Sequence, residues 1–350
     1  MEQSTKKIRV MVVDDSMLAR HIIQSGLSGF PNIEVVGEAI NAMDARKKLP
    51  VLNPDVMTLD VEMPGMNGID FVKEILPVHP IPIILVSSLN LRVFDAMAVG
   101  AVDFVRKPDT NDGNDRFFEA LANKIVVASC ARVRRPLIRP NTAVKRPSAL
   151  SLKVGAAPTE VIIGLGASTG GTEATLAVLR RLPANIPGMV IVQHMPPGFT
   201  KMYAERLDRI CKMKVKEAEH GDEIVRGQVL IAPGDKQMRV VRNGTRYTVS
   251  CMPGEKVSGH CPSVDALFHS MAENVRCHMV GIIMTGMGSD GAKGLLEMRK
   301  KGAYTIGQDK ESCVVYGMPM VAHNIGAVMQ QAPCENIANV LVRHLSNSHM

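Results

Sequence analysis

The amino-acid sequence predicts an α/β protein with two doubly wound parallel-sheet domains. Apolar runs of strand length alternate with stretches of helical spacing through residues 7–109, and a second alternation fills residues 160–345. Such alternation is typical of parallel sheets covered by helices. Most of the runs are almost continuously apolar, as strands buried on both faces are. Because 350 residues exceed the usual size of one core, two domains are expected.

The segment 126–158 separates the two alternations. It holds seven basic residues and no acidic one, is rich in Pro, Ser and Ala, and shows no amphipathic period. This composition predicts a flexible linker whose charge could help it dock on an acidic partner. We therefore expect one domain at residues 1–125, the basic linker at 126–158 and a second domain at 159–350.

The first domain is expected to alternate five strands with helices. The strands are the apolar runs at 7–15, 33–39, 54–60, 81–88 and 101–109. The helices, assigned from the spacing of apolar residues, are 16–29, 41–50, 68–76 and 90–100. Ser16 is a candidate N-cap of the first helix, and Gly29 is a candidate stop signal.

Polar residues fall at the ends of these strands: Asp14, Asp15, Asp60, Ser87 and Lys107. The carboxyl ends of parallel strands share one crevice, so we expect the five side chains to lie together. Three carboxylates repel one another unless a cation joins them, and oxygen ligands suit Mg²⁺. A carboxylate beside Mg²⁺ can attack phosphorus, while lysine and serine hold the phosphoryl oxygens. Each aspartate alone could instead be an ordinary turn residue.

The second domain is expected to follow the same alternation with an irregular middle. Strands are predicted at 160–168 and 188–195, in the first part of 277–291, and at 303–309. Helices are predicted at 170–183, 196–211, 263–275, 292–302 and 334–345. Residues 213–252 predict short strands and turns, with a small antiparallel hairpin at 242–246. Ser263 is a candidate N-cap, and Gly302 is a candidate stop signal.

Ser168 lies in a glycine-rich turn between a predicted strand and a predicted helix. A dinucleotide-binding domain uses such a turn to cradle a phosphate, whereas a hydrolase places a nucleophilic serine there, as in G-x-S-x-G. The glycines are one residue out of register for G-x-G-x-x-G. The next strand ends in His194, which is a usual general base for serine but a poor acceptor for a ribose hydroxyl. The hydrolase interpretation is therefore favoured.

His194 and Asp290 complete a candidate catalytic triad with Ser168. All three follow predicted strands, so a parallel sheet would bring them to one edge. His194 would take the proton from Ser168, and Asp290 would stabilise the imidazolium. The backbone N–H groups of Gly170 and Met287 are candidate oxyanion donors. Taken singly, the three residues could be a helix cap, a structural histidine and a turn residue, but their coincidence favours the triad. Five further histidines are predicted to be ordinary surface or core residues: His220, His260, His269, His278 and His323.

Composition excludes several other classes of protein. No apolar run reaches the ~20 residues of a membrane span, and no signal peptide is predicted at the N-terminus. The seven cysteines form no C-x-x-C pair, so reduced thiols and a cytoplasmic location are expected. No helix-turn-helix pattern follows residue 126, and no nucleic-acid partner is expected.

The first 125 residues resemble a response-regulator receiver domain. The resemblance rests on "VMVVDDS", "TLDVEMPGMNGIDF", "LVSS" and "GAVDFVRKP". It implies a flavodoxin-like strand order, with Asp60 as the phosphoryl acceptor and Ser87 and Lys107 as switch residues. It further implies Mg²⁺ held by Asp15 and Asp60, with Asp14 close by and the Glu62 backbone carbonyl as another ligand. Phe104 stands where the family often has a switch aromatic.

The second half resembles the catalytic domain of the CheB family of chemotaxis protein-glutamate methylesterases. The resemblance rests on "GLGASTGGTEA", "VQHMPPGFT", "IAPGDKQM", "PSVDALF", "MTGMGSDGAKGL" and "SCVVYGMPMVA". It implies a Rossmann-like fold, the triad Ser168, His194 and Asp290, and no cofactor at the esterase site. The implied substrates are methyl esters and particular glutamines of membrane chemoreceptors. The implied phosphodonor is the chemotaxis histidine kinase.

Together, one phosphoryl site and one hydrolytic site predict a gated esterase that serves chemotactic adaptation. Phosphorylation of Asp60 would loosen a receiver that otherwise blocks Ser168. The enzyme would be cytoplasmic and recruited to chemoreceptors without membrane insertion. Two alternatives remain: a gated serine esterase for a protein outside chemotaxis, and a non-enzymatic, phosphorylation-controlled binding regulator. A nicotinamide-dependent oxidoreductase is supported only by the glycines near residue 168.

Overall fold

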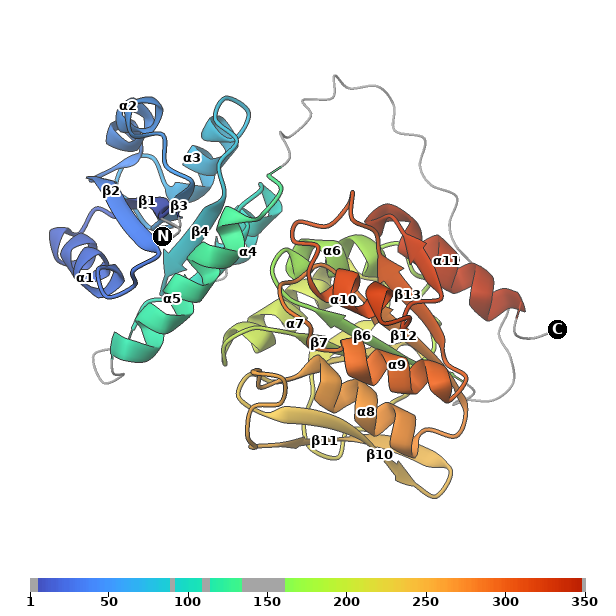
Figure 1. Ribbon diagram of the computed structural model, residues 1–350. Coiled ribbons are helices and arrows are strands. Elements are labelled where there is room, and N and C mark those ends of the chain that lie inside the picture. Colours follow the sequence, from blue (N-terminus) through green and yellow to red (C-terminus); the bar gives the residue numbers. More distant parts are fainter. Residues whose placement is uncertain (1–5, 89–91, 109–113, 134–160, 348–350) are drawn as a thin grey trace, which may run out of the picture. The chain divides into compact units, whose positions relative to one another are not determined.

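The computed structural model describes residues 6–88, 92–108, 114–133 and 161–347 (Figure 1). The chain divides into two compact units, with the division between residues 143 and 144. Most of the predicted linker, residues 134–158, lies outside the described residues. Among the described residues, no helix is both long enough and apolar enough to cross a membrane.

The first unit is a five-stranded parallel sheet in the order β2-β1-β3-β4-β5. Its strands are β1 (Ile8–Val13), β2 (Ile33–Ala39), β3 (Val56–Leu59), β4 (Ile83–Ser87) and β5 (Asp103–Arg106). Its helices are α1 (Met17–Leu27), α2 (Ala42–Leu52), α3 (Gly68–Ile75), α4 (Arg92–Ala98) and α5 (Asn114–Ser129). Helices α1 and α5 pack together, while α3 packs against α2 and α4 (Figure 1). The predicted doubly wound sheet is therefore confirmed.

Local signals explain where several helices begin and end. The Ser16 side chain accepts a hydrogen bond from the Ala19 N–H and caps α1, as predicted. Helix α5 was not among the predicted helices. It continues to Ser129, so the domain end predicted at residue 125 falls inside a helix and the linker cannot begin at 126.

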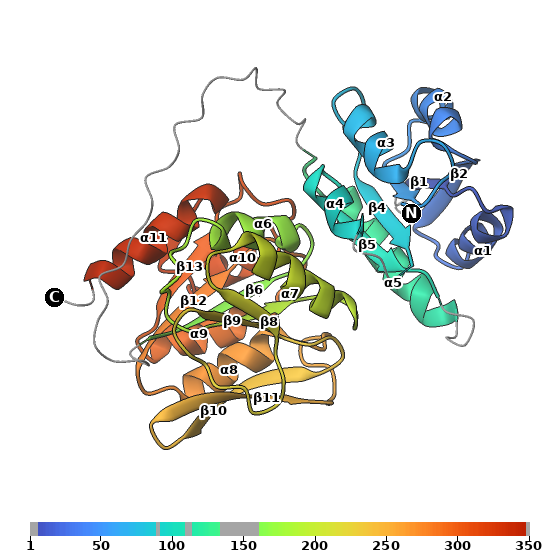
Figure 2. The same cartoon turned by 180° about the vertical axis from the view of Figure 1, so that it is seen from behind.

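The second unit contains a seven-stranded parallel sheet in the order β14-β13-β12-β6-β7-β9-β8 (Figures 1 and 2). Its strands are β6 (Val161–Ala167), β7 (Met189–Gln193), β8 (Lys214–Glu217), β9 (Gln228–Ile231), β12 (His278–Ile283), β13 (Tyr304–Gln308) and β14 (Gln330–Ala332). Strands β10 (Gln237–Asn243) and β11 (Arg246–Met252) form a separate antiparallel hairpin around Gly244, as predicted. Of the predicted irregular middle, β8 and β9 instead join the parallel sheet.

Six helices accompany the described part of this sheet. They are α6 (Gly171–Leu179), α7 (Phe199–Ile210), α8 (Val264–Asn274), α9 (Ala292–Lys300), α10 (Met318–Asn324) and α11 (Cys334–Asn347). Helix α8 packs between α9 and the β10–β11 hairpin, whereas α6 packs against α11. Ser263 caps α8 as predicted, but the short elements α10 and β14 were not predicted.

The order of strands determines where functional side chains can meet. Strand β6 lies between β7 and β12, and all three run parallel. The chain therefore winds outward in both directions from β6, which makes this part of the sheet a topological switch point. Loops that follow neighbouring strands at such a point border a common crevice. Ser168, His194 and Asp290 each follow one of these three strands.

Candidate functional site

The first unit gathers an acidic cluster at the carboxyl ends of its central strands. Asp14 and Asp15 follow β1, and Asp60 follows β3. Ligand oxygens of the three side chains lie within 4.8 Å of one another. Asp14 and Asp60 are buried, whereas Asp15 is exposed. Oxygen donors gathered in this way fit a hard divalent cation, so the donor set agrees with the predicted metal site.

Lys107 neutralises part of this acidic charge. Its Nζ atom lies 2.8 Å from Asp14 Oδ2 and 2.6 Å from Asp60 Oδ2. Burial raises the pKa of Asp60, although the hydrogen bond from Lys107 opposes that rise. Burial alone would lower the pKa of Lys107, but its bonds to the two carboxylates leave that pKa raised. The lysine is therefore held as a cation beside the predicted phosphoryl acceptor.

Ser87 and Glu62 also border the predicted acceptor. Ser87 ends β4, and its buried Oγ atom has no hydrogen-bond partner among the described residues. An unpaired buried hydroxyl is unfavourable, so this atom is available to a group that enters the crevice. The Glu62 N–H donates to Asp60 Oδ1 over 3.1 Å, and the Glu62 side chain is exposed. Phe104, the candidate switch aromatic, is buried and packs edge-on against Phe94 at 6.0 Å between ring centroids.

Arg20 supports this crevice and was missed by the sequence analysis. Its Nη1 atom donates to the Asp14 carbonyl over 2.8 Å and to the Asp15 carbonyl over 3.2 Å. Its Nε atom pairs with Glu38 on β2. The side chain is buried, which is unusual for arginine and requires these partners. An arginine one turn into a helix that follows two aspartates was the available signal.

In the second unit, Asp290 is held by four hydrogen-bonding groups. Its Oδ1 atom accepts from Ser263 Oγ and from the Asp265 N–H, each over 2.8 Å. Its Oδ2 atom accepts from the Val264 N–H over 2.8 Å and lies 2.8 Å from His194 Nε2. Burial alone would raise the pKa of Asp290, but His194 and the backbone donors at the start of α8 hold that pKa below its ordinary value. Asp290 is therefore kept ionised.

His194 follows β7, and its side chain contacts Asp290. Its main-chain N–H donates to Ala167, the residue before Ser168, over 3.1 Å. Its Nε2 atom contacts Asp290, so its Nδ1 atom is the one left for a serine. That Nδ1 atom is buried and has no hydrogen-bond partner among the described residues. The structure thus joins His194 to Asp290, while no hydrogen bond between Ser168 Oγ and His194 is present in the described part of the chain.

The loop after β12 packs directly against Ser168. The Ser168 N–H donates to the Thr285 carbonyl over 3.0 Å. A Cβ atom at Gly286 would lie 2.6 Å from Ser168 Cβ, so this close approach requires glycine. Gly170 precedes α6, and neither its N–H nor that of Met287 donates a hydrogen bond within the described residues. Both candidate oxyanion donors are therefore unsatisfied amides near Ser168.

His260 also belongs to this site, contrary to the expectation that it is an ordinary surface or core residue. Its ring stacks on the ring of His194, with 3.8 Å between centroids and 12° between planes. The two residues are 66 positions apart in the sequence. No spacing rule links them, so the sequence alone offered no signal for this contact.

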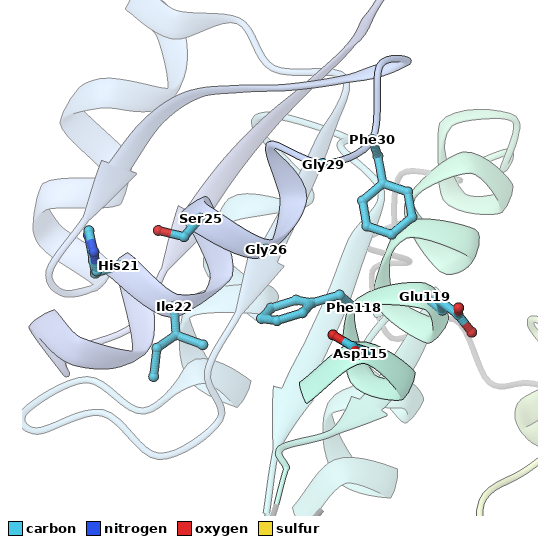
Figure 3. A pocket seen from close by; sticks show the side chains of 9 residues that line it. All are labelled: His21, Ile22, Ser25, Gly26, Gly29, Phe30, Asp115, Phe118 and Glu119. Carbon is cyan, nitrogen blue, oxygen red and sulfur yellow. The ribbon is translucent and has the colours of Figure 1, made fainter. Parts of the chain in front are cut away.

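A cavity of about 680 Å³ lies between α1 and α5 of the first unit (Figure 3). Phe30 and Phe118 contribute apolar rings to its lining, and Asp115 and Glu119 contribute carboxylates. None of the predicted site residues lines it. The cavity is therefore separate from both candidate sites.

Comparisons with known proteins agree with this two-part organisation. Residues 10–116 match the model of the response regulator receiver domain, and residues 163–341 match that of the CheB methylesterase. A protein-glutamate methylesterase/protein-glutamine glutaminase 2 from Syntrophomonas wolfei subsp. wolfei is 50% identical, with 97% of this chain and 98% of that protein covered. A protein-glutamate methylesterase/protein-glutamine glutaminase from Salmonella typhimurium is 42% identical, with 97% of both chains covered.

A solved structure gives the same result for the second unit. The crystal structure of the Thermotoga maritima CheB methylesterase catalytic domain is 36% identical, with a TM-score of 0.51. The match covers 53% of this chain and 98% of that one. Fold and matches together define a receiver domain joined to a hydrolase-like α/β domain. The chain belongs to the CheB methylesterase family.

Proposed function

We propose that the chain is a protein-glutamate methylesterase and protein-glutamine glutaminase whose activity is controlled by phosphorylation. The observation that carries this proposal is the His194–Asp290 pair, 2.8 Å long and part-buried, at the sheet edge where Ser168 follows the adjacent strand. The relatives' names specify the two activities. The substrates would be methyl-accepting chemoreceptors.

The reaction follows from the roles that each group can fill. His194 Nδ1 accepts the proton of Ser168 Oγ as that oxygen attacks the glutamyl ester carbonyl. The Gly170 and Met287 amides stabilise the oxyanion of the tetrahedral intermediate. His194 then returns the proton to the leaving group, so methanol departs from an ester and ammonia from a glutamine. Water, deprotonated by His194, then attacks the acyl-enzyme, His194 passes that proton to the departing Ser168 Oγ, and a glutamate side chain is left.

Asp290 stays ionised throughout this cycle. Its negative charge stabilises His194 while the imidazole carries two protons, and its contact with Nε2 leaves Nδ1 free for serine. The backbone donors at the start of α8 are fixed, so no reorganisation is needed when the charge on His194 appears.

The receiver unit supplies the control. Asp60 would accept a phosphoryl group from the chemotaxis histidine kinase, and Ser87 and Lys107 would bind the phosphoryl oxygens. Asp14, Asp15, Asp60 and the Glu62 carbonyl would hold Mg²⁺, which when bound offsets negative charge as phosphorus is transferred. Phosphorylation adds charge and strong acceptor oxygens, which biases the receiver toward its active form. The protein would act in the cytoplasm and be recruited to membrane chemoreceptors.

The test is methanol release from a methylated chemoreceptor fragment. The intact chain, with and without Mg²⁺ and acetyl phosphate, is compared with Ser168→Ala. Release that the phosphodonor stimulates and the substitution abolishes supports the whole proposal. An intact, demonstrably phosphorylated chain that releases no methanol would favour a different protein substrate or a binding regulator.

A further inference from the structure

The His194 ring is held by a single polar contact. Its Nε2 atom meets Asp290 Oδ2, whereas Nδ1 has no partner in the described part of the chain. One hydrogen bond fixes a distance but leaves the ring able to turn about that bond. Proton transfer from a serine requires a fixed ring plane as well as a fixed distance. A second constraint on His194 is therefore needed.

The ring of His260 supplies a constraint of this kind. It lies 3.8 Å from the His194 ring, and the planes differ by only 12°. A flat group packed on one face of an imidazole blocks rotation about an axis in the ring plane. It also covers that face against water. The contact acts on the ring plane, which the Asp290 bond leaves free.

His260 is itself held by a tight turn. Val257 and His260 exchange backbone hydrogen bonds of 3.0 and 2.9 Å across Ser258 and Gly259. Both intervening residues have positive φ, +50° and +84°, as a two-residue hairpin turn requires. Ser258 is a non-glycine residue in this region, so the turn is strained unless other contacts support it. Gln237 Nε2 adds a bond of 2.9 Å to the His260 carbonyl.

Asp265 is hydrogen-bonded both to this turn and to Asp290. Its Oδ2 atom accepts from Ser258 Oγ over 2.7 Å, and its main-chain N–H donates to Asp290 Oδ1 over 2.8 Å. The Asp265 side chain is buried at the start of α8. One residue therefore positions both the turn that carries His260 and the carboxylate that contacts His194.

We infer that His260 is a positioning residue for the esterase reaction, which holds the His194 imidazole in the plane that serves Ser168. Its stacked ring, carried on the Ser258–Gly259 turn and anchored through Asp265, provides the second constraint that Asp290 alone does not. This inference rests on the proposed function. It assigns His260 no proton transfer and no contact with substrate.

The test compares His260→Ala and His260→Phe in the full chain, with methanol release measured under activating phosphodonor. Loss of the stack in His260→Ala should lower kcat by about 30-fold and leave KM within about twofold, since only the alignment of His194 changes. Phenylalanine restores a flat ring without ring nitrogens, so His260→Phe should regain kcat to within about threefold of the native value. His220→Ala, an exposed histidine in the same unit, is the matched control and should match the native chain.

A second variant tests the hydrogen bond between Ser258 and Asp265 instead of the His260 ring. Ser258→Gly removes the hydroxyl that donates to Asp265 but suits the positive φ, so the turn itself can persist. We expect kcat to fall by about fivefold with KM unchanged. This variant also carries the test if His260→Ala does not fold.

The outcomes separate this inference from the proposed function. A native chain that releases no methanol, or a Ser168→Ala chain that is as active as the native one, would overturn the proposed function. A native kcat in His260→Ala would overturn the inference alone. An equal loss of kcat in His260→Phe and His260→Ala would also overturn it, because stacking would then not be the property that matters.

Discussion

The two units each bury a carboxylate at the ends of parallel strands, but they neutralise it in different ways. Asp60 is paired with the side chain of Lys107, which remains 28% exposed. Asp290 is surrounded by backbone N–H groups and Ser263 at the start of α8. Burial raises the pKa of Asp60, whereas the pKa of Asp290 is lowered. The proposed phosphoryl acceptor therefore has a partly exposed side chain as its counter-charge, whereas the proposed triad carboxylate has backbone donors at a helix start.

The largest effect on activity should come from substitutions in the proposed triad of the second unit. Ser168→Ala and His194→Ala should each lower kcat for methanol release by about 10⁴-fold or more, because they remove the nucleophile and its base. Asp290→Asn should lower kcat by roughly 10⁴-fold, since the amide cannot stabilise a protonated His194. A loss of less than about tenfold in any of these variants would contradict the triad.

Substitutions at Asp60 and Lys107 in the first unit should remove or weaken the control of esterase activity by phosphorylation. Asp60→Asn lacks the oxygen that accepts the phosphoryl group, so the ratio of rates with and without acetyl phosphate should fall to about 1. Lys107→Ala should reduce the same ratio, because its cation is lost from the crevice. The measurement is methanol release with Mg²⁺, checked against phosphoprotein content. Full stimulation in Asp60→Asn would refute the assignment of the acceptor.

The free energy of unfolding should respond differently to loss of charge at Asp290 and at Asp60. At pH 7 in EDTA, Asp290→Asn should lower the free energy of unfolding by about 1–3 kcal/mol, because its NH₂ group faces donors. Asp60→Asn should leave that free energy unchanged or raise it, since burial disfavours the Asp60 charge.

The pH dependence of the free energy of unfolding tests whether Asp290 is ionised in the folded chain. The folded-state pKa of Asp290 lies below the ordinary 3.8, so its stabilising contribution is present above that pH. The contribution is lost as the pH falls through the folded-state value. The stability difference between the native chain and Asp290→Asn should therefore shrink below pH 3.8 in denaturant titrations. A difference that grows on acidification would show that Asp290 is not held ionised.

The smallest expected effect is on the free energy of unfolding, and it comes from substitutions at two helix caps. Ser263 is buried, and its side chain caps α8 and donates to Asp290, whereas Ser16 is exposed and its side chain caps α1 without a bond to another side chain in the described residues. Ser263→Ala should cost about 2 kcal/mol of unfolding free energy, since a buried acceptor also loses its partner. Ser16→Ala should cost about 0.5–1 kcal/mol. Equal costs in urea titrations would show that the bond to Asp290 adds no stability.

These caps also show what the sequence could predict. Ser16, Ser263 and the hairpin at Gly244 depend on neighbours within a few residues, and each prediction was confirmed. The parallel order of the strands followed from the alternation of apolar runs and helical spacing. It placed His194 and Asp290 at one edge, where the structure joins them.

The elements and contacts that were not predicted cannot be recognised from a short stretch of sequence. Helix α10 has seven residues with a proline at its start, and β14 has three, so neither shows a full period of its pattern. Arg20 meets Glu38, 18 positions away, and His260 meets His194 only once the chain has folded. The residues that support a site were therefore less predictable than those proposed to perform its chemistry.

The proposed chemistry depends above all on Ser168 as a nucleophile that His194 activates. The most direct measurement is labelling of the chain, activated with Mg²⁺ and acetyl phosphate, by a fluorophosphonate, followed by mass spectrometry of its peptides. We expect one modified residue, Ser168, with a labelling rate about 100-fold lower in His194→Ala. Labelling of another residue, or an unchanged rate at Ser168 in His194→Ala, would contradict it.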